Sequence, residues 1–141
     1  MRTVKRSWCT VLSLVIKRKW FEMIKCGEKR EEYRARKPYW QTRLYNWMKR
    51  GAGGRWHVVE FRNGYRKDAR RMAFLAGYNS RFEMRNGVLG VSSSLVVFEH
   101  RVEGDIVRHP EWGEPEGGHF AIHIGERLAF EGEQGGDHAD A

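Results

Sequence analysis

The spacing of apolar residues along the chain predicts short strands that alternate with two or three helices. Apolar runs rich in β-branched or aromatic residues predict strands over 8–16, 56–61, 94–100 and 120–124. Apolar residues at helical spacing predict helices over 17–26, 38–49 and 68–76. The pairs Asn63-Gly64 and Asn86-Gly87 are typical of tight turns. This succession of elements predicts an α+β fold with a small curled sheet.

A further strand is predicted over residues 30–36, just after Gly27, a glycine that suits a helix C-cap. Side chains alternate between the two faces of a strand, so Tyr33 and Ala35 are expected to point towards the core. The opposite face then carries three charged residues, Glu32, Arg34 and Arg36. The segment is thus expected to be buried on one face and charged on the other.

Length and composition predict one domain over residues 1–130, followed by an acidic tail over 131–141. A chain of 141 residues with 40% hydrophobic and 13% aromatic residues has the size and composition of a single folded domain. The only apolar residues after Phe130 are alanines, so the tail is expected to be disordered and dispensable for folding. No apolar run is long enough to cross a membrane and no secretory leader is recognisable, so a cytoplasmic setting is expected.

Positive charge is concentrated in the first part of the chain, and it predicts a polyanionic partner. The net charge is +8, but residues 1–50 hold 15 Lys and Arg against 4 Asp and Glu, whereas residues 101–141 hold 3 against 10. A strongly basic face attracts nucleic acid, because binding releases the counterions that surround the phosphates. The alternative is that the charge serves solubility, with the acidic end folded back onto the basic face.

The cysteines and histidines predict no metal centre, and no motif predicts a cofactor. Cys9 and Cys26 do not form a CxxC pair. His119 and His123 share a face of a predicted strand and His109 precedes them, but a zinc site needs further ligands in a closed geometry. The ligand is therefore expected to bind without a metal or a cofactor.

The most informative stretch is Gly-x-Lys-x-x-Glu-x-Arg, formed by Gly27, Lys29, Glu32 and Arg34. Gly27 allows a sharp turn after the preceding helix, and Lys29 follows where a long cationic side chain can reach into a cleft. Glu32 and Arg34 are two apart on a strand, so they share a face and can pair. The alternative is a solvated run of charges on an exposed turn.

This stretch, with Ile24 in the helix before it, resembles the GxKxxExR signature of the ASCH domain family. The family is similar to the PUA fold, a small β-barrel with helices packed around it. Residues 109–113, which read His-Pro-Glu-Trp-Gly, and residues 120–125 are similar to the C-terminal end of bacterial and phage members. The resemblance covers about residues 8–128. It implies a PUA-like β-barrel with two or three flanking helices and a cleft lined by Lys29, Glu32 and Arg34.

The resemblance also implies RNA binding, often in connection with translation. Some small members of the family are amidohydrolases that remove the acetyl group from N-acetylcytidine, and others are ribonucleases. The amidohydrolases carry a lysine at the position of Lys29, but their threonine nucleophile corresponds to Glu32 here. The missing hydroxyl means that this mechanism does not transfer intact. If the chain is an enzyme, Lys29 and Glu32 would be its catalytic residues, with Glu32 as a general base.

Aromatic and basic residues outside the motif extend the predicted binding surface. Tyr39 is expected to be exposed, where a base can stack on its ring, whereas core positions are expected for Trp20, Trp40 and Trp47. Besides Lys29 and Arg34, the basic residues expected to contact phosphate are Arg36, Arg62, Arg66 and Lys67. The sequence thus predicts a domain that binds RNA, another single-stranded nucleic acid or a nucleotide. A hydrolase acting on RNA or a modified nucleoside and a module that docks on an acidic protein are the alternatives.

Overall fold

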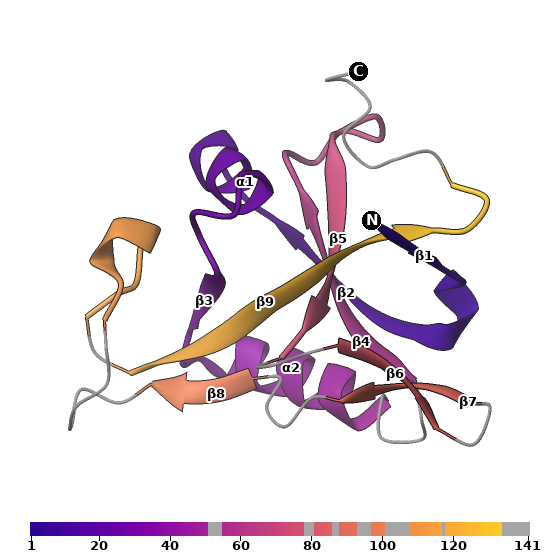
Figure 1. Ribbon diagram of the computed structural model, residues 1–141. Helices are drawn as coiled ribbons and strands as arrows, with labels where there is room; N and C mark the ends of the chain where they lie inside the picture. Colours follow the sequence, from indigo (N-terminus) through magenta and orange to yellow (C-terminus); the bar gives the residue numbers. More distant parts are fainter. Residues whose placement is uncertain are drawn as a thin grey trace.

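The computed structural model describes residues 1–50, 55–77, 81–85, 88–92, 97–100, 108–116 and 118–133 (Figure 1). The α-helices in this part of the chain are α1 Arg18–Lys25 and α2 Pro38–Arg50. The strands are β1 Arg2–Val4, β2 Cys9–Val15, β3 Glu31–Ala35, β4 Trp56–Arg62, β5 Arg71–Ala76, β6 Arg81–Arg85, β7 Val88–Ser92, β8 Val97–His100 and β9 His119–Phe130. Short 3-10 helices span Arg6–Trp8 and Pro110–Trp112. The fold is therefore α+β, as the sequence predicts.

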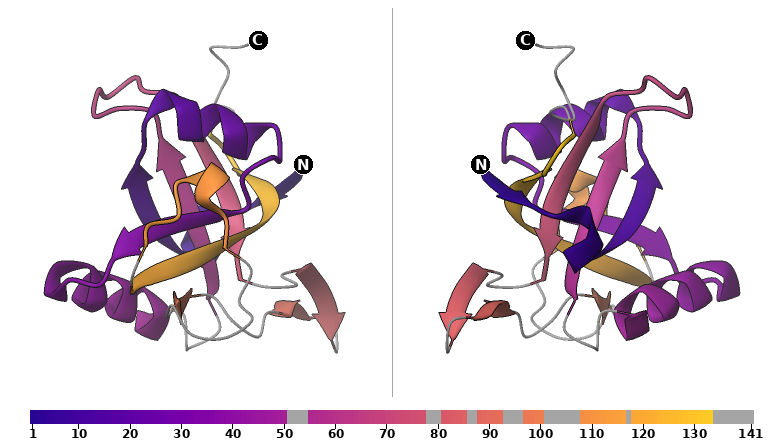
Figure 2. Two further views of the ribbon diagram at one scale, coloured as in Figure 1. Left: turned by 90° about the vertical axis from the view of Figure 1, so that its left-hand side faces the viewer. Right: turned by 90° about the vertical axis from the view of Figure 1, so that its right-hand side faces the viewer.

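One mixed sheet of seven strands is built around β9. The pairing order is β1-β9-β5-β4-β2, and β3 and β8 also pair with β9. The first half of β9 pairs with β3 and β8, and its second half pairs with β5 and β1. This long strand runs across the molecule and joins the two parts of the sheet (Figure 1). Among the described strands, no pairing closes this sheet into a barrel, and β6 and β7 form a separate hairpin that projects from the body (Figure 2).

Both faces of β4 and β5 are buried, each in a different hydrophobic cluster. On one face, Val59 and Phe61 of β4 pack in a large cluster with Phe21 of α1 and Trp47 of α2. On the other face, Val58 belongs to a smaller cluster that includes residues of β1 and of the end of β9. The large cluster holds both helices against the sheet, so it also positions the connection from α1 to β3.

The helix predicted over 68–76 is wrong, because residues Arg71–Ala76 form β5 and pair antiparallel with β4. Residues 72–76 are all buried and divide between the two clusters on opposite faces of the sheet. A short apolar run that is buried on both faces does not alternate between apolar and polar residues. Its periodicity therefore cannot distinguish a strand from a helix. Arg70, expected on the polar face of that helix, instead donates to Glu22 Oε1 of α1 at 2.6 Å.

The other predicted elements differ from the structure mainly at their ends. The predictions over 8–16, 17–26, 30–36, 38–49 and 56–61 agree with β2, α1, β3, α2 and β4 to within one residue at each end. The last strand is much longer than the predicted 120–124, because it continues to Phe130 along β5 and β1. Strands β1, β6 and β7 were not predicted, and the expected Asn86-Gly87 turn lies outside the described residues.

Two of the first three residues of the predicted acidic tail contact the N-terminal segment. The backbone N–H of Glu131 donates to Val4 O at 2.7 Å. The carboxylate of Glu133 accepts two hydrogen bonds from Arg6, from Nε at 2.7 Å and from Nη2 at 3.1 Å. The predicted disorder of residues 134–141 stays a prediction, because they lie outside the described part of the chain.

Truncation after Phe130 is therefore expected to lower the free energy of unfolding by about 1 kcal/mol, from one backbone hydrogen bond and an exposed ion pair. Truncation after Glu133 keeps both interactions and is expected to leave stability unchanged. Urea denaturation of the two truncated chains beside the full chain measures the difference. Equal stability of all three chains would show that residues 131–133 add nothing, as the sequence alone predicts.

Candidate functional site

The Gly-x-Lys-x-x-Glu-x-Arg motif lies where α1 ends and β3 begins (Figure 1). Gly27 has a φ of 85°, in the left-handed region that glycine adopts without strain. Its N–H donates to Ile24 O at 3.1 Å, and the N–H of Lys29 donates to Met23 O at 3.0 Å. These two bonds cap the helix and turn the chain directly into β3, as the predicted helix–turn–strand order requires.

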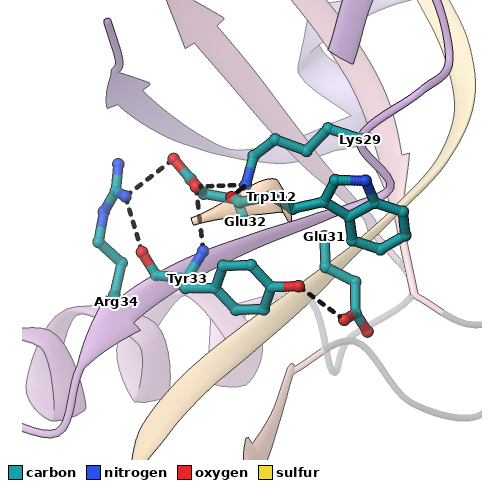
Figure 3. A network of polar contacts seen from close by, with 6 residues as sticks. All are labelled: Lys29, Glu31, Glu32, Tyr33, Arg34 and Trp112. Atoms are coloured by element: carbon teal, nitrogen blue, oxygen red, sulfur yellow. Dashed lines mark hydrogen bonds and ion pairs between the residues drawn. The ribbon is translucent and has the colours of Figure 1, made fainter. Parts of the chain in front are cut away.

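Lys29 is buried rather than exposed on the turn, with 1% of its surface accessible. Its Nζ donates to Trp112 O at 2.5 Å and lies 3.3 Å from Glu32 Oε1 (Figure 3). The ammonium also lies 5.0 Å from the ring centroid of Trp20 and 4.7 Å from that of Tyr33. Burial lowers the pKa of Lys29 from its ordinary value, and the negative charge of Glu32 opposes this shift.

Both carboxylate oxygens of Glu32 are engaged within the motif. Oε1 accepts from the N–H of Tyr33 at 3.0 Å and faces Lys29, and Oε2 accepts from Arg34 Nη1 at 2.9 Å. The predicted pairing of Glu32 with Arg34 is thereby confirmed. Arg34 Nη1 also donates to Tyr33 O at 2.8 Å, so the guanidinium is fixed at two points.

The predicted division of β3 into an apolar face and a charged face is only partly correct. Tyr33 is buried as expected, but Glu31 and Glu32 are buried as well, and Ala35 is exposed. Glu31 points away from Glu32, and its Oε1 accepts from the Tyr33 hydroxyl at 3.0 Å (Figure 3). Hydrogen bonds and ion pairs therefore allow both carboxylates to be buried, which hydrophobic alternation alone does not anticipate.

Lys29 joins the two stretches of sequence that carry the family resemblance. Its partner Trp112 lies 83 residues away, in the His-Pro-Glu-Trp-Gly segment. The next residue, Gly113, has a φ of 81°, and a Cβ there would lie 2.8 Å from the Trp20 ring. The segment therefore packs closely on α1, and Lys29 holds its backbone in that position.

A cleft of about 660 Å³ lies beside the motif. Its volume falls within the roughly 300–1,000 Å³ typical of small-molecule sites. The lining residues come from β2, α1, β3, α2, the β4–β5 loop and the 109–113 segment. They are Ser13, Val15, Ile16, Lys17, Trp20, Glu32, Tyr33, Arg34, Tyr39, Trp40, Arg43, Tyr65, Trp112 and Gly113. The cleft therefore combines three cations and six aromatic rings with one carboxylate, which is already paired.

One wall of the cleft is built around Trp40. The guanidinium carbons of Arg34 and Arg43 lie 5.0 Å and 5.2 Å from its ring centroid. Arg43 Nη2 donates to Ser13 O at 2.6 Å, which fixes α2 against β2. The Tyr39 ring meets Trp40 edge-on, with the centroids 5.0 Å apart. Tyr39 itself is 63% exposed, as the sequence predicts.

The structure brings some of the predicted site residues together and leaves others apart. Glu32, Arg34 and Tyr39 line the cleft, whereas Lys29 is enclosed behind it and is not a lining residue. The remaining predicted phosphate contacts, Arg36, Arg62, Arg66 and Lys67, do not line the cleft either. Within the β4–β5 loop, Arg62 Nη2 donates to Arg66 O at 2.8 Å, and Arg66 pairs with Asp68 at 3.3 Å.

Sequence reasoning missed Lys17, Arg43 and Tyr65 as cleft residues. Arg43 follows Tyr39 by four residues on α2, so the two share one face of that helix. That spacing could have identified Arg43 from the sequence. Tyr65 lies in the basic turn over 61–67 that was expected to contact phosphate, but the contacts were assigned to its basic residues. Lys17 had no such signal, because the fold brings the end of β2 to the cleft.

Neither the described residues nor the comparisons with known proteins assign a function to this chain. Within the described ranges, no group of three or more His, Cys, Asp or Glu side chains is placed to hold a metal ion. None of the helices described here is long and apolar enough to cross a membrane. Comparisons with protein-family models, with curated proteins and with solved structures found no match to this chain.

Proposed function

We propose that this chain is an ASCH-like domain of the PUA-like β-barrel kind that binds RNA or a nucleotide in the cleft. The observation that carries this proposal is the shared lining of one cleft by cations and exposed aromatic rings. Cations contact phosphates, and every base has a face that can stack on an aromatic ring. The contact between Lys29 and Trp112 supports the ASCH-like assignment, because it joins the two stretches on which the resemblance rests.

The aromatic residues of the cleft divide into supporting and binding groups. Trp40 already has two guanidinium groups against its ring, and Trp20 packs on Lys29 and Gly113. Tyr39 and Tyr65 are 63% and 88% exposed, so their rings are accessible to a base. We assign base stacking to these two tyrosines and phosphate contacts to the cations that line the same cleft.

A hydrolase acting through Lys29 and Glu32 is the alternative that the geometry supports less well. A general base needs an oxygen free to take a proton from the substrate or from water. Glu32 accepts from Arg34 and from the Tyr33 backbone and faces Lys29, so both of its oxygens are occupied.

Tyr39→Ala is expected to weaken binding of a short single-stranded RNA about tenfold, because one base loses its stacking partner at about 1–3 kcal/mol per base. The matched control is Tyr45→Ala. Tyr45 is on the same helix and is 62% exposed, but it does not line the cleft. Fluorescence anisotropy at low salt gives the affinity of each variant.

The comparison of the two tyrosines tests where the RNA binds. Lys17→Ala and Lys49→Ala form a second pair, since both lysines are exposed and only Lys17 lines the cleft. Weaker binding by the two cleft variants alone supports the proposal. If all four variants bind RNA like the wild type, or if both controls lose as much affinity, the cleft is not the binding site.

A further inference from the structure

The loop between β4 and β5, residues 63–70, carries an aromatic side chain that is almost fully exposed. Tyr65 is 88% exposed and yet lines the cleft, so its ring stands at the rim of the cleft and not in its interior. Its neighbours Arg66 and Lys67 are exposed as well. Residues 62–70 hold four basic residues against one acidic residue. The loop therefore presents a ring and cations together, which is the combination that binds single-stranded nucleic acid.

Hydrogen bonds within the loop hold it in one shape before any ligand binds. The N–H of Asn63 donates to Arg70 O at 3.0 Å, and the N–H of Ala69 donates to Arg66 O at 3.0 Å. The side chain of Arg70 donates to Glu22 Oε1 at 2.6 Å, which ties the base of the loop to α1. Because the loop is already ordered, binding a ligand there costs less entropy than it would on a mobile loop.

The two exposed tyrosines of the cleft belong to elements that lie apart. Tyr39 is in the first turn of α2, and Tyr65 is in the β4–β5 loop. Figure 2 shows α2 at one end of β4 and the loop at the other end. A mononucleotide has a single base, so it can stack on one of these rings and leave the other unused. Both rings are used only by a ligand with at least two bases.

The size of the cleft leads to the same conclusion. Its volume of about 660 Å³ falls in the range of sites that take one small molecule. A chain of several nucleotides cannot lie wholly inside such a volume, so it has to leave the cleft over the rim. Tyr65 stands at this rim with Lys67 close to it in the loop.

We propose that the ligand is a single-stranded oligonucleotide and not a mononucleotide, and that its strand continues from the cleft onto the β4–β5 loop. There Tyr65 stacks on a second base and Lys67 contacts the backbone phosphate. Arg66 is already paired with Asp68 at 3.3 Å, so the phosphate contact is assigned to Lys67. This inference rests on the proposed function, because it selects RNA over a free nucleotide and extends the site beyond the cleft.

The test compares ligands of different length on the same protein. Adenosine monophosphate, an adenine ribodinucleotide and an adenine ribotetranucleotide are titrated by calorimetry at one salt concentration. Wild-type protein is expected to bind the tetranucleotide at least about tenfold more tightly than the monophosphate, because a second base is stacked.

Substitutions of Tyr65 show whether the loop causes this difference. Tyr65→Ala is expected to weaken tetranucleotide binding about tenfold and monophosphate binding less than about twofold. Tyr65→Phe keeps the ring and is expected to bind both ligands like the wild type. The matched control is Tyr45→Ala, since Tyr45 is 62% exposed and does not line the cleft.

The outcomes separate this inference from the proposed function. If the monophosphate binds as tightly as the tetranucleotide, the oligonucleotide is refuted as the ligand while nucleotide binding in the cleft stands. If Tyr65→Ala leaves tetranucleotide binding unchanged, or weakens both ligands equally, the loop does not hold a second base. If none of the ligands binds, the proposed function itself fails.

A second measurement does not depend on a variant. In wild-type protein with labelled tyrosine rings, the Tyr65 ring resonances are expected to shift on addition of the tetranucleotide and to stay in place with the monophosphate. The Tyr39 resonances are expected to shift with both ligands. A tetranucleotide that binds without moving the Tyr65 resonances would overturn the assignment to the loop.

Discussion

Replacing Lys29 with alanine is expected to lower the free energy of unfolding by about 3–4 kcal/mol, because removing one partner of a buried ion pair leaves the other uncompensated. Lys29 is 1% exposed, and its ammonium contacts Glu32 Oε1 and Trp112 O. Alanine would leave the Trp112 carbonyl without this donor and open a cavity beneath Trp20 and Tyr33. The 109–113 segment would lose its hydrogen bond to Lys29, so RNA affinity is expected to fall with stability.

Two further variants separate charge, packing and surface effects. Lys29→Met fills most of the volume but leaves both polar partners without the ammonium, so a loss of about 2 kcal/mol is expected. Lys49→Ala removes an exposed lysine of α2 and is expected to change stability by less than about 0.5 kcal/mol. Urea denaturation, analysed with a common dependence of the free energy of unfolding on urea concentration, gives the loss of stability of each of the three variants. If Lys29→Ala is as stable as Lys49→Ala, the motif is a solvated run of charges after all.

The local structure of the motif was predictable, but the burial of its lysine was not. Gly27, the end of α1 and the start of β3 follow from spacing and from the properties of glycine. The sequence offered two positions for Lys29, in a cleft or on a solvated turn, and the structure shows neither. Its carbonyl partner lies 83 residues away, and no local pattern carries that information.

The sheet gives a second case in which the local sequence does not predict the structure, this time for apolar residues. The strand β4 was predicted because its run of aromatic and β-branched residues is flanked by turn residues. The neighbouring β5 was predicted as a helix, although it pairs with β4 along its length. Both strands are covered on both faces by clusters built by distant elements, and what distinguishes them is composition, because β4 contains two valines whereas β5 contains no β-branched residue. Propensity and periodicity describe one segment, whereas burial on two faces is a property of the assembled core.

The cleft residues were predictable to different degrees. Arg34 and Tyr39 were found because they belong to the motif and to the start of the next helix. Arg36 was expected beside them, but it lies at the exposed end of β3 outside the cleft. The basic residues of the β4–β5 loop were predicted from charge, yet Tyr65 is the loop residue that reaches the cleft. Charge predicts that a polyanion is attracted, and only the fold determines which side chains surround it.

In the proposed binding site, Lys29 and Glu32 support Arg34. Lys29 neutralises one oxygen of Glu32, and the other oxygen positions Arg34, whose guanidinium lies against Trp40. Lys29 thus fixes Glu32, and Glu32 fixes Arg34, which lines the cleft. Fixed hydrogen-bond donors bind an anion with a smaller loss of entropy than mobile ones. The contacts within the motif therefore hold Arg34 in position at the cleft.

The affinity for single-stranded RNA is expected to fall about 50-fold when the salt concentration rises from about 50 to 200 mM. The estimate assumes about four phosphate contacts and a slope of about −0.7 per contact for single strands. Lys17, Arg34 and Arg43 line the cleft, and Lys67 is exposed on the loop that carries Tyr65. Each phosphate contact releases condensed counterions, so the salt dependence reports the number of contacts.

Single substitutions show which cations contribute to that slope. Lys17→Ala removes one cleft cation and is expected to reduce the slope by about 0.7, and Lys67→Ala by the same amount if the loop contacts the backbone. Lys49→Ala lies outside the cleft and is expected to leave the slope unchanged. Affinities measured by anisotropy at four salt concentrations give each slope. An affinity that does not change with salt would remove the polyanion as the partner, and it would favour docking on a protein through the aromatic side chains of the cleft.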